Sequence, residues 1–478
     1  MIQALVPTAG ARVSERMTIG QFGDPRREAR GALIMERAMA CGSLTIRTIG
    51  ETRAGEIGVH RFLDCPEVTV DEIIATLGER TAAACSDRRI VAIQDTTEIN
   101  FRGRDRNRRG LGRGGDGVGL GFFIHPTIAV DAADEAVLGI LAAHIWSRRP
   151  DQDGSTRRQR RQRELAEKES KRWLDGAAMA AQRAEAAAQV IVVGDRESDI
   201  FALFARRPER AELLVRAAQD RAVEDGGRLF AQAAGWPVLA TYPLDVPPRG
   251  PGDRGRTAAM VLRAGRICIK RPRNGLVESD PAQLTLTLVE AVEDHPPAAT
   301  PPIRWRLLTT LPAETAEQAA EVVRLYRLRW RIEQTFRALK SDGLGLPDVQ
   351  LRDAERLFKL AAIGLGAAVR TIQLVDARDG GPRPASDVAD PALIEAARAI
   401  GPTLEGNTLK QQNPHPPQSL AWITWIVARL GGWTGYYKPP GPKVIRRGWD
   451  RFAAMAEGYL LAKPLPPAQI VTDHVRIP

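Results

Sequence analysis

Residues Arg88–Thr97 read RRIVAIQDTT, and this stretch decides the fold that we expect for the chain. A short apolar run such as Ile90–Ile93 indicates a buried β-strand, and Asp95 ends this one. A second apolar run, VIVVGD, ends in Asp195 in the same way. The sequence therefore predicts two buried strands with an aspartate at the end of each.

The segments around these strands predict an α/β fold. After Asp95 come a loop rich in arginine and glycine (102–121) and two β-like runs, FFIHPTIAVD and EAVLGILAAHIW. A second basic loop (148–163) precedes an alanine-rich stretch (164–189) with strong helix propensity. Asp195 is followed by a short helical segment and by another apolar run, AELLVRAAQ. We expect the order three strands, helix, strand, helix, strand.

The rest of the chain divides by its local patterns. Short helical patterns fill the first part of the chain, and the part after Leu351 is mostly helical as well. Between them lies a region of alternating runs, broken by proline and glycine, that is typical of β-strands. We expect a helical domain (1–75), a catalytic α/β domain (76–225 and 312–375), a β insertion within it (226–311) and a helical C-terminal domain (376–478).

The stretch LYRLRWRIEQTFRALKSDG (Leu325–Gly343) predicts one amphipathic helix with a polar row beside its apolar stripe. At about 100° per residue, the row holds Tyr326, Arg329, Glu333 and Lys340. One interpretation is a solvated helix face with an ion pair between Arg329 and Glu333, which are four residues apart. The other interpretation is a row that faces a negatively charged ligand.

Three carboxylates favour the second interpretation. Asp95, Asp195 and Glu333 would repel one another if they were gathered, and this repulsion would raise their pKa values. Divalent metal ions remove that cost. Carboxylate oxygens suit Mg²⁺, and two such ions can activate a water or a 3′-hydroxyl and stabilise the leaving oxygen of a phosphodiester. The sequence therefore predicts that these three acids are catalytic metal ligands and that the other members of the row hold neighbouring phosphates.

Charge and composition fit a nucleic-acid partner. The 478 residues include 68 Lys and Arg against 58 Asp and Glu, which gives a formal net charge of +10 and makes a polyanion the natural partner. The four cysteines form no CxxC pair or disulfide framework, which indicates reduced, intracellular thiols. Because we find no apolar run of about 18 residues and no export signal, we expect a cytoplasmic protein, associated with the nucleoid through DNA and not with a membrane.

Several sequence blocks resemble those of one family. The chain carries YxxRxxxExxxxxxK from Tyr326 to Lys340, DTT at Asp95 and DRESD at Asp195. These blocks are similar to those of the insertion sequence 4 family of cut-and-paste DNA transposases, typified by the transposase of transposon five. FGDPRREAR, HRFLDCPEVT, EKESKRWL and ARLGGW also occur in the order of that family, so the resemblance covers nearly the whole chain. It implies a ribonuclease H-like catalytic domain with an inserted β domain.

The resemblance also implies a mechanism. A triad of Asp95, Asp195 and Glu333 would use Mg²⁺, with Mn²⁺ as a substitute, to nick the transposon end with water. The freed 3′-hydroxyl would form a hairpin, and the reopened end would attack double-stranded target DNA. The C-terminal helices would form a homodimer that holds two transposon-end inverted repeats together. The residues implied to bind DNA are Tyr326, Arg329, Lys340, Trp305 (stacked on a flipped base), Arg216 and, in the end-binding N-terminal module, Arg26, Arg27 and Arg30.

Two other functions stay open. A nuclease on the same fold would cut DNA without strand transfer, and a non-catalytic inhibitor of transposition would be expected to lack one of the acids or the N-terminal module. Structural roles are also open for single features: Asp95 could cap a turn, Trp305 could be a core residue, and the arginine clusters (102–113 and 157–163) could be solvated loops. Asp199 is better explained as a helix cap or salt-bridge partner than as a metal ligand.

Overall fold

A computed structural model describes most of the chain, and its internal packing divides the protein into two compact units. The first unit is Thr18–Asp376, and the second runs from Ala377 onward. The described residues are 17–101, 108–115, 118–148, 168–224, 226–248, 255–272, 280–298, 300–340, 343–436 and 438–462.

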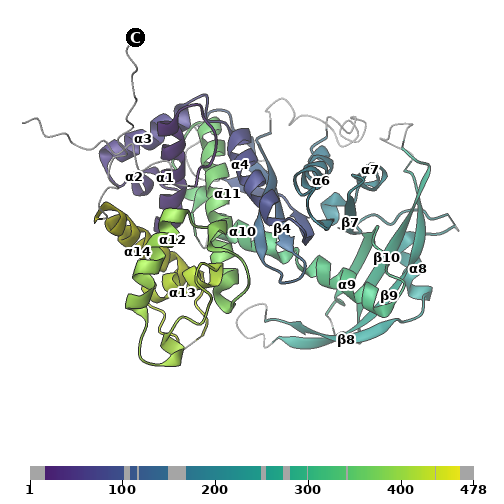
Figure 1. Cartoon of the computed structure of the whole chain (residues 1–478). Helices are drawn as coiled ribbons and strands as arrows, with labels where there is room; N and C mark the ends of the chain where they lie inside the picture. Colours follow the sequence, from purple (N-terminus) through teal and green to yellow (C-terminus); the bar gives the residue numbers. More distant parts are fainter. Residues whose placement is uncertain are drawn as a thin grey trace, which may run out of the picture. The chain divides into compact units, whose positions relative to one another are not determined.

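One mixed β-sheet runs through the first unit (Figure 1). Within the described residues its strands lie in the order β2-β4-β1-β6-β7-β11-β10-β9-β8, and β3 and β5 also pair with β4. The strands are β1 (Arg89–Gln94), β2 (Thr97–Asn100), β3 (Gly112–Arg113), β4 (Leu120–Asp131), β5 (Val137–Trp146), β6 (Gln189–Gly194), β7 (Ala211–Arg216), β8 (Ala240–Val246), β9 (Arg256–Lys270), β10 (Gln283–Asp294) and β11 (Arg304–Thr309).

Helices precede, interrupt and follow this sheet. In the first unit they are α1 (Pro25–Cys41), α2 (Ile46–Gly50), α3 (Arg53–Asp64), α4 (Val70–Ala84), α6 (Lys171–Arg183), α7 (Phe201–Ala205), α8 (Leu229–Gln232), α9 (Ala316–Arg327), α10 (Trp330–Lys340) and α11 (Ala354–Asp376). In the second unit α12 (Pro391–Ile400), α13 (Leu420–Leu430) and α14 (Pro442–Ala462) pack on one another. The mixed α/β class and the helical C-terminal part agree with the sequence prediction.

The two predicted strand-end aspartates lie at the same edge of the sheet. β1 and β6 are parallel neighbours, and Ile90–Ile93 pair in order with Val190–Val193. Asp95 lies two residues after Ile93, and Asp195 lies two residues after Val193. Because parallel strands run in the same direction, the turns that follow them leave the sheet side by side.

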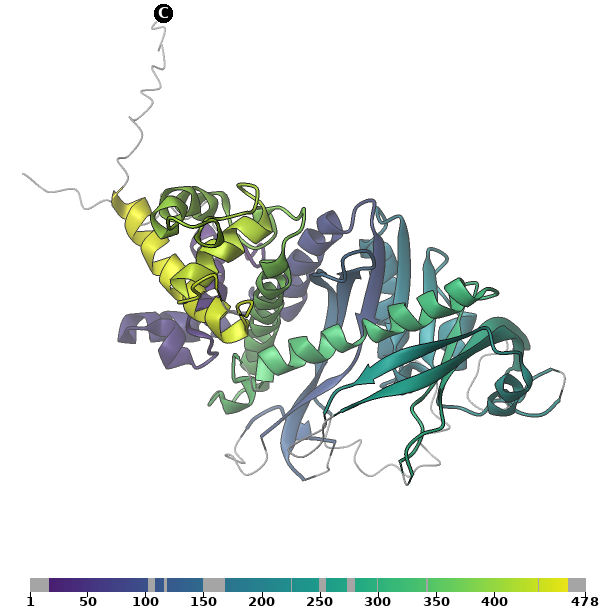
Figure 2. The ribbon, with the colours of Figure 1, turned by 90° about the horizontal axis from the view of Figure 1, so that it is seen from below.

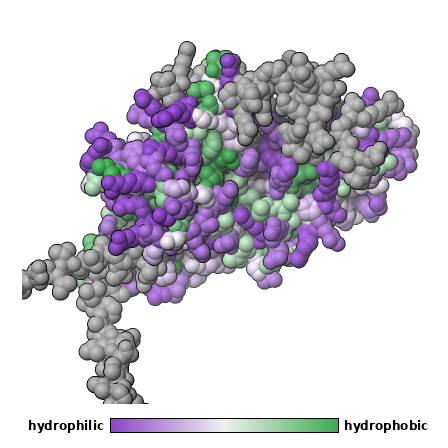
Figure 3. All heavy atoms as spheres, turned by 90° about the horizontal axis from the view of Figure 1, so that it is seen from above, coloured by the Kyte–Doolittle hydropathy of each residue, from purple (hydrophilic) through white to green (hydrophobic). Residues whose placement is uncertain are grey.

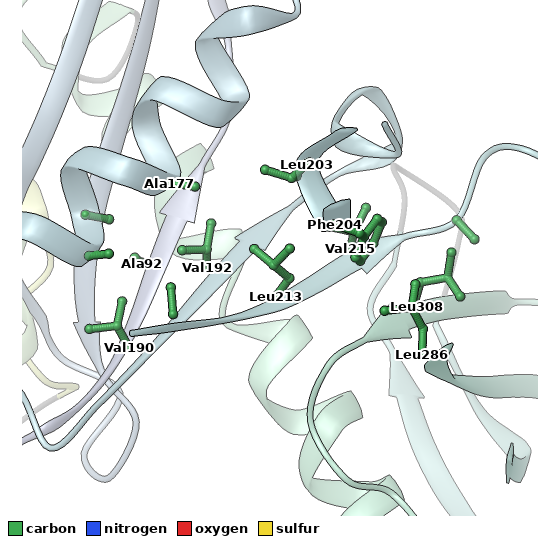
Figure 4. Packing of buried hydrophobic residues seen from close by; sticks show 14 of the residues in the cluster. Ala92, Ala177, Val190, Val192, Leu203, Phe204, Leu213, Val215, Leu286 and Leu308 are labelled. Carbon is green, nitrogen blue, oxygen red and sulfur yellow. The ribbon is translucent and has the colours of Figure 1, made fainter. Parts of the chain in front are cut away.

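The core on one face of the sheet is made by strands and by α6 and α7 (Figure 4). Ala92, Val192 and Leu213 come from three adjacent strands, while Ala177 of α6 and Phe204 of α7 cover them. The intervening residues of β1 and β6 are buried too, so both faces of these strands are covered, as is usual for parallel strands. This packing fixes the strand ends that carry the aspartates.

The range 226–311 contains β8, β9, β10 and β11 besides the short helix α8, and these strands extend the central sheet. β11 pairs with β7 on one side and with β10 on the other, and β9 and β8 follow outward. The chain therefore returns through β11, directly beside the strand that it left. The predicted alanine-rich helix (164–189) is shorter than expected, since α6 covers only Lys171–Arg183.

The predicted single helix Leu325–Gly343 is wrong in one respect, because it is two helices. α9 and α10 follow each other end to end (Figure 2), with a tight turn between them. There the Arg329 N–H donates to the Tyr326 carbonyl (3.0 Å) and the Arg331 N–H to the Leu328 carbonyl (2.9 Å), as in a 3₁₀-helix. Side chains three residues apart eclipse in such a turn, which keeps Tyr326 and Arg329 on the same side.

Helix α11 is long and apolar enough to cross a membrane, but it is a core helix. About 83% of its apolar window is buried inside the protein, and its buried cations Lys359 and Arg370 interrupt the apolar sequence. The Lys359 ammonium donates to the Leu63 and Cys65 carbonyls and thereby ties the end of α3 to α11.

The face drawn in Figure 3 is mostly hydrophilic among the coloured residues, with hydrophobic side chains in short patches.

Asp199 is a structural residue, as the sequence analysis favoured. Its Oδ1 lies 2.5 Å from Arg221 Nη2, and both side chains are almost fully buried. Its Oδ2 accepts the backbone N–H groups of Ala218 and Gln219, each at 2.7 Å. Asp199 therefore holds the segment after β7 against the turn after β6.

Asp199→Ala should lower the free energy of unfolding by about 3–5 kcal/mol, because it leaves the charge of Arg221 buried without its partner. Urea unfolding measures the change. Asp175→Ala is the matched control, since Asp175 pairs with Lys171 on an exposed helix face and should cost less than about 0.5 kcal/mol. Equal small losses for both variants would contradict the prediction.

Candidate active site

A pocket of about 420 Å³ lies where β1 and β6 end. Three segments that are far apart in the sequence meet there: the turn after β1, the turn after β6 and one side of α10. The lining residues are Asp95, Thr96, Thr97, Asp195, Glu197, Arg329, Glu333, Phe336, Arg337 and Lys340. The pocket thus brings together the three predicted acids and two of the predicted phosphate-binding residues.

Asp95 is held from two sides. Its Oδ1 accepts the backbone N–H of Thr96 at 2.7 Å, and its Oδ2 accepts Nη1 of Arg329 at 2.7 Å. The same Arg329 nitrogen lies 3.4 Å from Oε1 of Glu333. The guanidinium therefore sits between two of the three acids, and the ion pair between Arg329 and Glu333 that one interpretation of the sequence suggested is part of the pocket.

The pKa of Asp95 is raised from 3.8 to about 7. Burial is the largest cause, and the negative charge of Asp195 is the next. Glu333 also raises this pKa, while Arg329 and the Thr96 backbone N–H lower it. Near neutral pH, the pocket therefore favours a proton or a cation at Asp95.

The donor set fits a hard divalent cation, although the side chains are not arranged as a ready-made metal site. The acids Asp95, Asp195 and Glu333 offer oxygen ligands, which Mg²⁺ prefers. Yet no group of three or more His, Cys, Asp or Glu in the described part of the chain is positioned to hold a metal ion. Arg329 supplies the positive charge between Asp95 and Glu333 instead. A cation in that place requires Arg329 to move.

Tyr326 and Arg216 interact with each other and do not line the pocket. Tyr326 is only 5% exposed, and burial raises the pKa of its hydroxyl, which hydrogen-bonds to Arg216. Nη2 of Arg216 also donates to the Arg304 carbonyl at 3.2 Å, and burial lowers the pKa of this guanidinium. Both predicted DNA contacts thus have partners within the protein, and neither lines the pocket in the present arrangement.

Two further predicted DNA contacts, Lys340 and Trp305, have different positions. Lys340 lines the pocket, where burial lowers the pKa of its ammonium while Glu98 and Glu333 act in the opposite direction. Trp305 is half-buried on β11, where it pairs with Ala291 of β10, and it does not line the pocket. Trp305 follows Arg304, whose carbonyl accepts the hydrogen bond from Arg216.

The arginines at the start of α1 are not equivalent. Arg26 is exposed, whereas Nη1 of Arg27 donates to the Phe22 carbonyl. The guanidinium of Arg30 packs in the space that a side chain on Gly58 of α3 would need. Arg27 and Arg30 thus help to hold the N-terminal helices, and Arg26 is the most accessible of the three.

The two arginine clusters of the sequence analysis are only partly described. The cluster 157–163 lies wholly outside the described residues, and so do residues 102–107 of the cluster 102–113. Arg108, the first described residue of the cluster 102–113, is buried and donates to the carbonyls of Val349 and Leu351, so this residue is a structural contact.

A polar network that includes two pocket-lining residues, Thr96 and Glu197, was not predicted from the sequence. Oγ1 of Thr96 lies 2.9 Å from Nδ1 of His125, whose Nε2 lies 3.0 Å from Oε1 of Gln94. Nε of Arg172 donates to the same Thr96 oxygen at 3.0 Å, and its Nη2 donates to Oε2 of Glu197 at 2.8 Å. No local motif signals these contacts, because the partners lie on separate strands, turns and helices.

Asp95→Asn should be more stable than the wild type at pH 8 in EDTA, and this advantage should be roughly 2–3 kcal/mol smaller at pH 5. Because the folded-state pKa of Asp95 is raised, the stability present below 3.8 is lost as the pH rises through about 7. Asparagine avoids this loss, which is at most roughly 4 kcal/mol. Urea unfolding at both pH values measures the difference, with the exposed Asp175→Asn as control. A difference that does not change with pH would contradict the raised pKa.

A comparison with known protein families assigns the chain. Residues 125–370, just over half of the chain, match a family model described as a transposase DDE domain. The matched segment includes Asp195, Glu333 and the strands and helices that carry them, and it begins after Asp95. The chain therefore belongs to the DDE transposases, a family of DNA-cleaving enzymes that carry out DNA transposition.

Proposed function

We propose that this protein is a cut-and-paste transposase similar to the insertion sequence 4 family and to the transposon five transposase. Its catalytic domain would be ribonuclease H-like. The antiparallel strands β1, β4 and β5, followed by α6, β6, α7 and β7, support that architecture. The proposed divisions are an end-binding helical domain (1–75), a catalytic domain (76–225 and 312–375) with a β insertion (226–311), and a C-terminal dimerisation domain (376–478).

One observation carries the proposal: the acids Asp95, Asp195 and Glu333 line one pocket although they come from three distant segments. These residues would hold two Mg²⁺ ions, for which Mn²⁺ would substitute. Bound ions would activate a water or a 3′-hydroxyl and stabilise the leaving oxygen of a phosphodiester. The raised pKa of Asp95 supports this assignment, since perturbed carboxylates cluster at functional sites.

Arg329 would change partners during the reaction. It now offsets the charges of Asp95 and Glu333, and it would leave them to bind a DNA phosphate beside the pocket. Lys340, at the same pocket, would bind a second phosphate. Tyr326 and Arg216 would hold the backbone further from the scissile bond, since neither lines the pocket.

The partners would be transposon-end inverted repeats, target DNA and a second copy of the chain. Arg26, with Arg27 and Arg30, would contact the end sequence from α1, and Trp305 would stack on a base flipped out of the duplex. The net charge of +10 supports a DNA partner. A hairpin intermediate would release the transposon from the flanking DNA before its 3′-hydroxyl ends attack the target.

The two alternatives fit less well. The family match favours transposition over a nuclease that only cuts. A non-catalytic inhibitor of transposition would be expected to lack one of the acids, whereas all three line the pocket.

Arg329→Gln should bind Mn²⁺ several-fold more tightly than the wild type without DNA, because it removes the cation that competes between Asp95 and Glu333. The same variant should lose DNA cleavage. Isothermal titration with Mn²⁺ measures the affinity. Arg331→Gln is the control, since Arg331 pairs with Asp376 away from the pocket and should leave the affinity unchanged. Unchanged or weaker affinity in Arg329→Gln would show that this arginine does not occupy a cation position.

DNA carrying the inverted repeats that flank the gene should yield joined products in Mg²⁺. Incubation of the protein with such DNA and a target plasmid, followed by sequencing of the junctions, tests strand transfer directly. Cut ends without junctions would favour the nuclease. Neither cutting nor joining, with end binding retained, would favour the inhibitor.

A further inference from the structure

Two turns carry the strand-end acids, and one guanidinium contacts both turns. Nε of Arg172 donates to Oγ1 of Thr96, the residue after Asp95, at 3.0 Å. Nη2 of Arg172 donates at 2.8 Å to Oε2 of Glu197, two residues after Asp195. Arg172 itself belongs to α6 and does not line the pocket.

All three guanidinium nitrogens of Arg172 donate hydrogen bonds, which fix the orientation of the side chain. Its third nitrogen, Nη1, donates to the Glu169 carbonyl at 2.8 Å, and its side chain is only 10% exposed. The rings of Trp146 and Trp173 lie 5.7 and 5.4 Å from its Cζ atom. A planar guanidinium with three directed hydrogen bonds can set the spacing of the groups that it joins, which a lysine ammonium does less well.

The contact to Thr96 continues into the core. Since Oγ1 of Thr96 accepts from Arg172, its O–H is free to donate to Nδ1 of His125 at 2.9 Å. Nε2–H of His125 then donates to Oε1 of Gln94 at 3.0 Å. Burial holds the pKa of His125 well below its ordinary value, which keeps the ring in the neutral form that this chain of donors requires. The Asp95 turn is thus anchored to buried groups.

We propose that Arg172 is a positioning residue that clamps the Asp95 and Asp195 turns together so that their carboxylates can share divalent cations. The two acids repel each other, and this repulsion acts to separate the turns. Arg172 offsets it by bonding to both turns, without lining the pocket. This inference rests on the proposed function, because the clamp would serve to let the two carboxylates share metal ions.

Arg172→Gln and Thr96→Val should both weaken Mn²⁺ binding by roughly 10- to 100-fold, as is typical when a group that orients metal ligands is lost. The valine matches threonine in shape and removes only the hydroxyl that Arg172 and His125 share. Isothermal titration of the full chain with Mn²⁺, without DNA, measures the affinity. In cleavage assays both variants should need a correspondingly higher Mn²⁺ concentration, with a nearly unchanged rate at saturation. A general loss of structure would lower that saturating rate as well.

Two matched variants separate positioning from general effects. Thr96→Ser keeps the hydroxyl and should keep the wild-type affinity. Lys171→Gln removes the neighbouring cation of α6, which pairs with Asp175 on an exposed helix face, so the affinity for Mn²⁺ should not change.

The outcomes for the clamp and for the proposed function are distinguishable. If Asp95→Asn loses Mn²⁺ binding while Arg172→Gln and Thr96→Val bind like the wild type, the clamp is overturned and the metal site stands. If the wild type shows neither Mn²⁺ binding nor Mn²⁺-dependent cleavage, or if Asp95→Asn equals it in both, the proposed function itself fails. If the wild type binds Mn²⁺ only with DNA, the Mn²⁺ concentration that cleavage requires decides on the clamp. Should Arg172→Gln not fold, Thr96→Val against Thr96→Ser decides the question, because that pair leaves Arg172 in place.

Discussion

The structure depends on the electrostatic cost of gathering carboxylates at one edge of a sheet. In-register pairing of β1 with β6 places Asp95 and Asp195 on adjacent turns, and α10 adds Glu333 to the same pocket. Burial and mutual repulsion raise the pKa of Asp95 to about 7, so a compensating positive charge is needed near neutral pH. Arg329 provides that charge from within the pocket. The acids attract cations and the arginine attracts phosphates. This arrangement therefore suits an enzyme that binds both.

Two of the basic residues at or near the pocket, Arg329 and Arg216, already have partners within the protein. Arg329 pairs with acids, and Arg216 bonds to the Tyr326 hydroxyl and to a backbone carbonyl. These contacts hold long side chains in defined orientations, which reduces the conformational entropy that they lose on binding DNA. In the proposed function, the same contacts would have to be exchanged when phosphate arrives. Association with DNA would therefore be coupled to rearrangement of the charges around Asp95.

Sequence patterns predicted the elements well and their connections less well. The apolar runs before Asp95 and Asp195 specified β1 and β6, because buried parallel strands have a continuous apolar pattern. The helical period placed Arg329 beside Glu333, but it did not show the 3₁₀ turn that separates α9 from α10, since tertiary packing and not propensity decides such breaks. The ion pair of Arg329 with Asp95 and the hydrogen bonds of Arg172 join residues far apart in the chain. Local patterns carry no information about such pairs.

The central claim is that three acids from separate segments share divalent ions over a DNA backbone. Anomalous scattering from crystals of the protein with transposon-end DNA and Mn²⁺ tests it most directly. The account predicts Mn²⁺ peaks bounded by carboxylate oxygens of Asp95, Asp195 and Glu333, with Arg329 moved onto a phosphate. Mn²⁺ bound elsewhere, with Arg329 still paired to Asp95 beside bound DNA, would contradict it.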